Sequence, residues 1–545
     1  MNPNDILTTE TAGLPDSQRP GSIRLRDGDR FDLAIVSIRK LLGDLELRMI
    51  GYNGSIPGPT LHVDQGSEIT IGVANNGDFD TTVHWHGVRL ENRYDGVPHD
   101  TQAPIPVGGD FTYKVHFPDP GCFWYHPHMR EDYAQELGMY GPIVVEPADP
   151  MYWPPADRHV TITLDDLLIE DGRIAPFLKS MTTFSAMGRF GNVMLINGEL
   201  TFADHARRGE VVRMFLLNTA NTRIFNFGIR GARIKLVGGD SGRHERELFV
   251  DQVLIAPSER IVLDVLFDTV GDIRLEHRTP DRTYDLGAFA VTDGEDGNAA
   301  KVFDTLRVNC EFDAERQQLD HASAPDKVLA FVASMPALYG NDEGSASSYV
   351  CPMHPDVTAT SRATCPKCGM KLMPVTDTPA HADHAGHADH AEHVNAAHAE
   401  HHTSHGMAHH DGIEWEDLMP AINRASTSSN MTWKLVDRQT GLENHGINWA
   451  FKVGDRIKIR LVNEMESDHP MHHPFHIHGA GRFLIMSRNG KPEANLVWKD
   501  TVLVRMGETV DILLDVTNPG RWMAHCHIAE HVESGMMLSF DVSPA

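Results

Sequence analysis

Residues 67–75 read SEITIGVAN, and the pattern returns as EVVRMFLLN at 210–218 and as DRIKIRLVN at 455–463. Apolar and polar side chains largely alternate in these stretches, which is typical of half-buried strands. A glycine precedes each stretch, and an asparagine closes it nine positions after that glycine. One unit therefore occurs three times in the chain, and its strands predict an all-β fold built from sandwiches.

Two further matched segments follow each of these strands. The first is VHWHGV at 83–88, IFNFGI at 224–229 and PFHIHG at 474–479. The second begins at Gly121, Gly271 and Gly520, and its fifth and seventh following positions hold His126 and His128, Glu276 and Arg278, and His525 and His527. Unit two thus lacks the paired histidines, and it carries Phe225 and Phe227 in the first segment. We expect it to be structural and to join the other two.

The chain has 545 residues, which predicts three or four domains at about 100 to 200 residues each. We expect β-sandwich domains at 1–150, 151–325 and 426–545. Residues 326–425 form an insert that holds a small metal-binding module at 347–375 and a His-rich tract at 381–410. The tract has no apolar periodicity, so we expect it to be disordered.

Composition excludes several classes of function. The formal charge is -28, with 76 acidic against 48 basic side chains, which disfavours nucleic acid and anionic membrane surfaces as partners. The sequence contains no run of about 18 apolar residues, so it does not predict insertion into a membrane. The opening MNPNDILTTE lacks the pattern of a signal peptide. Two localisations stay open: a cytoplasmic protein, or a periplasmic or exported protein whose signal was removed.

Four histidine-rich motifs stand out: HWH at 84–86, HPH at 126–128, HPFHIH at 473–478 and HCHIAEH at 525–531. Residues two apart on a strand point to the same face, so each HxH pair presents two imidazoles side by side. Such pairs from two domains give eight convergent histidines, which is enough for three copper ions. Cys526 lies between two of them and must serve a different metal on the opposite face. Thiolate, two imidazoles and a weak axial methionine make a blue-copper site, and His473, His531 and Met536 are available to complete it.

The motifs HWHG, HPH, HPFHIHG and HCHIAEHVESGMM resemble the copper signatures of three-domain multicopper oxidases of the laccase or cuprous oxidase type. The resemblance covers about residues 30–325 and 426–545 and implies cupredoxin-like Greek-key sandwiches. It implies substrate oxidation at a type 1 copper and reduction of dioxygen to water at three others. It also implies four copper ions, with type 1 bound by His473, Cys526, His531 and Met536, type 2 by His84 and His476, and the type 3 pair by His86, His126, His128, His478, His525 and His527.

Asp95, just after HWHG, matches the family's carboxylate near the cluster, and we expect it to donate protons. A turn aspartate before Gly96 is the alternative interpretation. Many bacterial members carry Glu immediately after the second type 1 histidine, but here that position is Val532. This departure places more weight on Asp95. Elsewhere, Cys122 and Cys310 are expected to be buried thiols.

The insert contains Cys351, His354, Cys365 and Cys368, in the motifs CPMHP and CPKCGM. These motifs resemble the heavy-metal-binding module of bacterial copper and silver transport proteins, and their soft ligands favour Cu(I). A structural zinc knuckle is the alternative. The His-rich tract either binds metal ions loosely or is an inert linker.

Three functions are compatible with these residues. A metal-capturing insert on an oxidase favours Cu(I) itself as the electron donor, with copper tolerance as the outcome. A general laccase for phenols and aromatic amines is the competing enzyme. A copper-binding or storage protein is the alternative from another class. The expected partners are dioxygen, Cu(I) or a phenol, and a copper donor protein.

Overall fold

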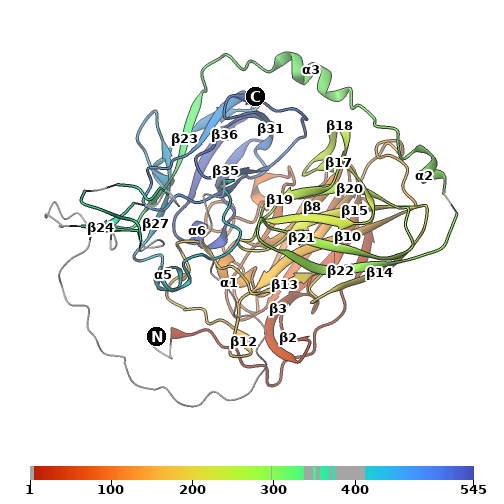
Figure 1. Ribbon diagram of the computed structural model, residues 1–545, viewed down its shortest axis with the longest axis horizontal. Helices are drawn as coiled ribbons and strands as arrows, with labels where there is room; N and C mark the ends of the chain where they lie inside the picture. The colour runs from red at the N-terminus through yellow and green to blue at the C-terminus, as the bar shows by residue number, and fades with distance from the viewer. Residues whose placement is uncertain are drawn as a thin grey trace.

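The computed structural model describes residues 5–295, 297–336, 348–351, 356–361, 363–366, 371–374 and 411–545. Strands dominate these residues, and their large sheets form three sandwiches (Figure 1). The all-β prediction is confirmed. No helix in the described ranges is long and apolar enough to cross a membrane.

The first sandwich joins a five-stranded and a four-stranded sheet. The five-stranded sheet has, in order, β1 (Ser22–Leu25), β4 (Thr60–Asp64), β9 (Gly141–Glu146), β8 (Gly121–Pro127) and β6 (Val83–His86). The four-stranded sheet has, in order, β3 (Leu45–Tyr52), β2 (Arg30–Leu42), β5 (Glu68–Asn76) and β7 (Asp110–His116). A short helix, α1 (Glu131–Ala134), follows β8. The inner faces enclose one apolar core that includes Tyr52, Trp85 and Tyr113.

The second sandwich has a six-stranded and a five-stranded sheet, drawn in yellow and green in Figure 1. The six-stranded sheet has, in order, β13 (Val193–Ile196), β10 (Arg158–Leu167), β15 (Glu210–Asn218), β20 (Arg260–Phe267), β17 (Arg233–Gly239) and β18 (Gly242–Val250). The five-stranded sheet has, in order, β14 (Phe202–Arg207), β22 (Thr283–Thr292), β21 (Gly271–Arg278), β16 (Phe225–Arg230) and β19 (Gln252–Ile255). Two short helices, α2 (Asn298–Val302) and α3 (Glu311–Gln318), lead away from it.

The third sandwich, drawn mainly in blue, has the same plan. Its six-stranded sheet has, in order, β27 (Thr432–Asp437), β23 (Lys327–Ser334), β29 (Arg456–Asn463), β34 (Thr509–Val516), β31 (Gly481–Arg488) and β32 (Lys491–Pro492). Its five-stranded sheet has, in order, β28 (Ala450–Lys452), β36 (Met537–Ser543), β35 (Gly520–Cys526), β30 (His473–Ile477) and β33 (Thr501–Val504). Helix α6 (Ala529–Glu533) follows β35, and α5 (Pro420–Ala425) precedes β27.

The repeated asparagine has the same structural role in each unit. Asn75 Nδ2 donates to the carbonyls of Phe79 and Ile105. Asn218 and Asn463, at the ends of β15 and β29, each donate from Nδ2 to two carbonyls in the same way. All three are buried. The asparagine therefore satisfies two buried backbone acceptors where the chain leaves the strand, which explains its recurrence.

One boundary differs from the sequence analysis. Strand β23 lies inside the range 326–425 that was assigned to the insert, yet it pairs with β27 and β29 in the third sandwich. Its sequence, KVLAFVAS, is a short apolar run that buries several side chains in that core. The third sandwich thus takes one strand from before the insert. Within the insert, β24 (Tyr349–Val350), β25 (Thr358–Ala359) and β26 (Met373–Pro374) form a small sheet.

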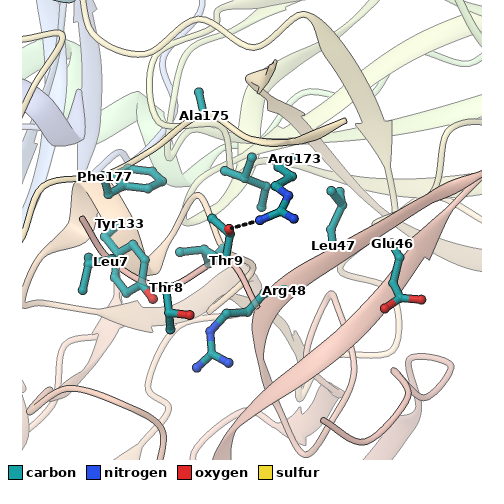
Figure 2. A pocket seen from close by; sticks show the side chains of 12 residues that line it. Leu7, Thr8, Thr9, Glu46, Leu47, Arg48, Tyr133, Arg173, Ala175 and Phe177 are labelled. Carbon is teal, nitrogen blue, oxygen red and sulfur yellow. Dashed lines mark hydrogen bonds between the residues drawn. The ribbon is translucent and has the colours of Figure 1, made fainter. Parts of the chain in front are cut away.

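A small cavity lies between the N-terminal segment and the first sandwich (Figure 2). It is lined by residues that include Leu7, Tyr133 and Phe177, and Arg173 Nη1 donates to Thr9 Oγ1 across it at 3.2 Å. Its volume is about 20 Å³, enough for a single water molecule. It is therefore too small for a phenol.

Candidate metal centre

The eight histidines of the HxH motifs meet between the first and third sandwiches, and none is more than 5% exposed. The register places His84 of β6 opposite His126 of β8. In the third sandwich, His476 of β30 lies opposite His525 of β35. The structure therefore brings together all eight histidines that the sequence analysis assigned to the trinuclear cluster: His84, His86, His126, His128, His476, His478, His525 and His527.

Hydrogen bonds to the main chain orient two of these rings. His84 Nδ1 lies 2.7 Å from the Asp95 carbonyl oxygen, and His476 Nδ1 lies 2.9 Å from the Asp500 carbonyl oxygen. Because a carbonyl accepts, each Nδ1 carries the proton and each Nε2 keeps its lone pair. Both Nε2 atoms are buried without a hydrogen-bond partner. An unpartnered buried nitrogen is costly, so a metal ion fits these two atoms, which are the predicted type 2 ligands.

The remaining rings form two groups of converging nitrogen atoms. His478 Nε2 lies 3.3 Å from His128 Nε2 and 3.1 Å from His525 Nε2. On the other side, His126 Nε2 lies 3.4 Å from His86 Nδ1. The ring of His527 lies beside those of His86 and His126, and both its nitrogen atoms lack a partner. These are two groups of three nitrogen donors, as a copper pair requires.

Burial favours the neutral, metal-binding form of these rings. Desolvation lowers the pKa of the cluster histidines His86, His126, His128, His476, His478, His525 and His527 below the usual value. A buried imidazolium would lose its hydration, and for His86 and His476 this loss outweighs the attraction of the Asp500 carboxylate. The site therefore offers lone pairs rather than positive charges to a cation.

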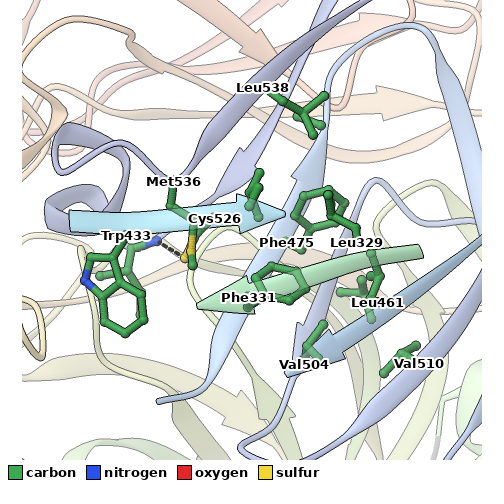
Figure 3. Packing of buried hydrophobic residues seen from close by; sticks show 14 of the residues in the cluster. Leu329, Phe331, Trp433, Leu461, Phe475, Val504, Val510, Cys526, Met536 and Leu538 are labelled. Atoms are coloured by element: carbon green, nitrogen blue, oxygen red, sulfur yellow. Dashed lines mark hydrogen bonds between the residues drawn. The ribbon is translucent and has the colours of Figure 1, made fainter. Parts of the chain in front are cut away.

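Cys526 occupies a second site in the core of the third sandwich. Its Sγ lies 3.5 Å from His473 Nδ1 and 3.7 Å from His531 Nδ1, and all three residues are buried. Burial raises the pKa of the thiol above its usual value, so the thiolate needs the positive charge of a metal. Figure 3 shows Cys526 and Met536 at one end of the apolar cluster, with Trp433 beside them. Soft donors in apolar surroundings suit a blue copper ion.

The two methionines after this motif differ in burial. Met536 is fully buried, and its carbonyl accepts a hydrogen bond from Cys526 N at 3.2 Å. Met537 lies at the start of β36 opposite His525 and is only half-buried. Met536 would therefore complete the donor set of Cys526, His473 and His531 better than Met537.

Three carboxylates contact the cluster histidines. Asp95 Oδ2 lies 2.8 Å from His478 Nδ1, so the predicted proton donor is at the cluster and fully buried. Asp500 and Glu131 were not identified from the sequence: Asp500 Oδ1 lies 3.1 Å from His86 Nε2, and Glu131 Oε1 lies 3.1 Å from His128 Nδ1. The three-residue spacing between His128 and Glu131 was a weak signal. Asp500 follows no histidine motif.

Other predicted residues lie outside these two centres. Cys351 and Cys365 of the insert are buried against the core of the third sandwich. Their proposed co-ligands His354 and Cys368, and the tract at 381–410, lie outside the described residues. Cys122 is buried as expected, but the prediction for Cys310 is wrong because that side chain is exposed at the start of α3.

Comparison with known sequences supports the copper interpretation. Residues 37–150 and 418–545 match family models described as multicopper oxidase, and these two segments contain every histidine of both centres. The chain therefore carries two multicopper oxidase domains. Residues 348–375 of this oxidase match a heavy metal binding domain.

Individual relatives span most of the oxidase. A laccase from Botryotinia fuckeliana is 25% identical, over 90% of this chain and 78% of its own. A copper resistance protein A homologue from Pseudomonas syringae pv. tomato is 23% identical, over 96% of this chain and 93% of its own. A solved metallo-oxidase from Campylobacter jejuni shares the fold, with a TM-score of 0.64, 20% identity, and coverage of 98% of this chain and 99% of that one.

Proposed function

We propose that this oxidase couples one-electron oxidation of a substrate to the four-electron reduction of dioxygen to water. Its coppers would be one type 1 ion held by His473, Cys526, His531 and Met536, one type 2 ion held by His84 and His476, and a type 3 pair held by the other six cluster histidines. Copper at these positions would accept the electrons from substrate and pass them to dioxygen.

The observation that carries this proposal is the position of Cys526 between two cluster residues. Its side chain faces His473 and His531, whereas the adjacent His525 and His527 face the other centre. One short stretch of backbone therefore joins the electron-accepting site to the dioxygen site. A storage protein needs no such link.

Water formation also needs four protons. We propose that Asp95 delivers them, since its Oδ2 contacts His478 and its carbonyl oxygen contacts His84. The turn at Gly96 does not by itself explain full burial of this carboxylate.

We further propose Cu(I) as the substrate. The insert is attached beside the type 1 centre: Lys371 Nζ forms an ion pair with Asp468 Oδ1 at 2.8 Å, five residues before His473. Cys351 and Cys365 belong to the same buried cluster as Cys526 and Met536. Soft ligands held against this sandwich suit the delivery of Cu(I). The likeness to a copper resistance protein agrees with this substrate.

The first test is dioxygen uptake by the copper-loaded protein, with Cu(I) and a simple phenol supplied separately at matched concentrations. Much faster uptake with Cu(I) is the expected result. Preference for the phenol would instead support a general laccase, the activity named for the Botryotinia fuckeliana relative. Copper-loaded protein that consumed no dioxygen with either donor would support storage.

Delivery by the insert is tested by deleting residues 347–410. Cuprous oxidation should fall much more than phenol oxidation, and equal loss would refute delivery. Lys371→Ala is the subtler variant because it breaks the ion pair to Asp468. Arg438→Ala is its control, since Arg438 pairs with Glu464 on the same sandwich. Only Lys371→Ala should lower the ratio of cuprous to phenol oxidation.

A further inference from the structure

One side chain of the second sandwich reaches the copper cluster. Arg260, the first residue of β20, is fully buried. Its Nε donates to the Cys122 carbonyl in the first sandwich at 2.9 Å, and its Nη1 donates to the Ser258 carbonyl at 3.1 Å. Both Nη atoms donate to the carboxylate of Asp500 in the third sandwich, with Nη1 to Oδ1 at 2.6 Å. One guanidinium thus connects all three sandwiches.

Asp500, which Arg260 holds in place, accepts hydrogen bonds from two cluster histidines. Its Oδ1 accepts from His86 Nε2 at 3.1 Å, and its carbonyl oxygen accepts from His476 Nδ1 at 2.9 Å. Thr501 Oγ1 donates to the same Oδ1 at 3.0 Å. With these nitrogen atoms protonated, His86 keeps its lone pair on Nδ1 and His476 on Nε2. His86 Nδ1 faces His126 Nε2, and His476 Nε2 has no hydrogen-bond partner.

The surroundings are built for an arginine at this position. Asp240 accepts from the main-chain N of Arg260 at 2.9 Å and pairs with Lys499 at 3.0 Å. Lys499 also pairs with Glu259 at 3.1 Å, so the buried charges largely balance. Gly87 of HWHG has a φ of +82°, and a Cβ there would lie 2.6 Å from both the arginine Nη2 and Asp500 Oδ2. The glycine next to His86 thereby leaves room for the guanidinium.

We propose that Arg260 is a positioning residue of the copper cluster, through which the second sandwich fixes Asp500 and so orients His86 and His476. The inference rests on the proposed copper cluster, and it gives the unit without ligands a part in the site. The planar fork of arginine holds both carboxylate oxygens at once, whereas a lysine would bind as a single point charge.

The test compares Arg260→Lys with Arg213→Lys. Arg213 and Asp264 form a similarly buried, two-pronged pair inside the second sandwich, with both hydrogen bonds at 2.8 Å. Both variants keep the positive charge but lose the planar guanidinium that binds both carboxylate oxygens. Copper affinity is measured by competition with a chelator, and the type 2 copper is examined by electron paramagnetic resonance. We expect about a 10- to 100-fold loss of affinity and an altered type 2 signal for Arg260→Lys alone.

Equal copper affinity and an unchanged signal in Arg260→Lys would overturn the proposal, as would equal losses in the control. If Arg260→Lys does not fold, Asp500→Asn replaces it and should alter the same signal. Neither readout requires turnover, so absence of dioxygen uptake by the wild-type protein would refute the oxidase function while this test still reports on Arg260.

Discussion

The second sandwich is built from two packed sheets like its neighbours, but it carries different side chains on the matching strands. In the first and third, paired strands place His84 opposite His126 and His476 opposite His525. In the second, β16 places Phe225 and Phe227 in an apolar core. The fold therefore does not specify a metal centre. A few side chains on two strands decide whether it binds copper, and the unit without ligands still supports the site from outside through Arg260.

The largest effect is expected from Cys526→Ser in the third sandwich. A serine oxygen is a poor substitute for the thiolate, so the type 1 centre should lose its blue absorption. Dioxygen uptake with every donor should fall by at least about 100-fold, because second-shell changes alone cost 10- to 100-fold. Absorption spectroscopy and uptake measurements check this. Normal turnover by the variant would refute the electron path through Cys526.

His86→Phe gives the first sandwich the kind of side chain that the second has at the matching place. It removes one nitrogen donor and the partner of Asp500 Oδ1. Copper analysis should show loss of copper from the cluster and of dioxygen uptake, while the blue type 1 absorption stays. If cluster copper were retained in full, the assignment of His86 as a ligand would be wrong.

The copper-free protein should respond to pH unevenly along the chain. Burial lowers the pKa of His473, of His531 and of the seven cluster histidines named above, so at these positions the unfolded chain binds more protons than the native one below about pH 6.5. Stability is therefore present above that pH and is lost as pH falls, by up to about 1.4 kcal/mol per pH unit for each such group.

Among the described residues, the first and second sandwiches each have three histidines with a lowered pKa, and burial lowers the pKa of His244 and His277 in the second to about 3. The third sandwich has eight such histidines. Hydrogen exchange at pH 7 and 5.5 should therefore show the greatest loss of protection in the third sandwich. Equal loss in all three would contradict the assignment of this loss to its buried histidines.

The smallest effect is expected from Phe227→Leu in the core of the second sandwich. It should cost roughly 1 kcal/mol of stability, the usual size for a core substitution. Copper content and uptake should not change, because Phe227 packs inside its own sandwich. Denaturant unfolding and copper analysis measure the two quantities. Loss of copper here would show that the second sandwich acts on the site through more than Arg260.

The sequence predicted what depends on short-range patterns. Alternation along strands gave the fold class, and two-residue spacing put the histidines on one face and Cys526 on the other. Arg260 and Asp500 could not be found in this way, because they are 240 residues apart and neither lies in a recurring motif. Strand β23 could not be placed in the third sandwich from sequence patterns, because its partner β29 lies on the far side of the insert.

That pairing has a consequence for how the protein tolerates change. Ser334 at the end of β23 lies opposite Thr432 at the start of β27, in neighbouring antiparallel strands. The region between them is topologically a hairpin connection, however long it is. Doubling the length of such a connection costs only about 0.6 kcal/mol of closure entropy. A metal-binding module could therefore be gained, lost or exchanged at this point without rebuilding the sandwich that holds the type 1 centre.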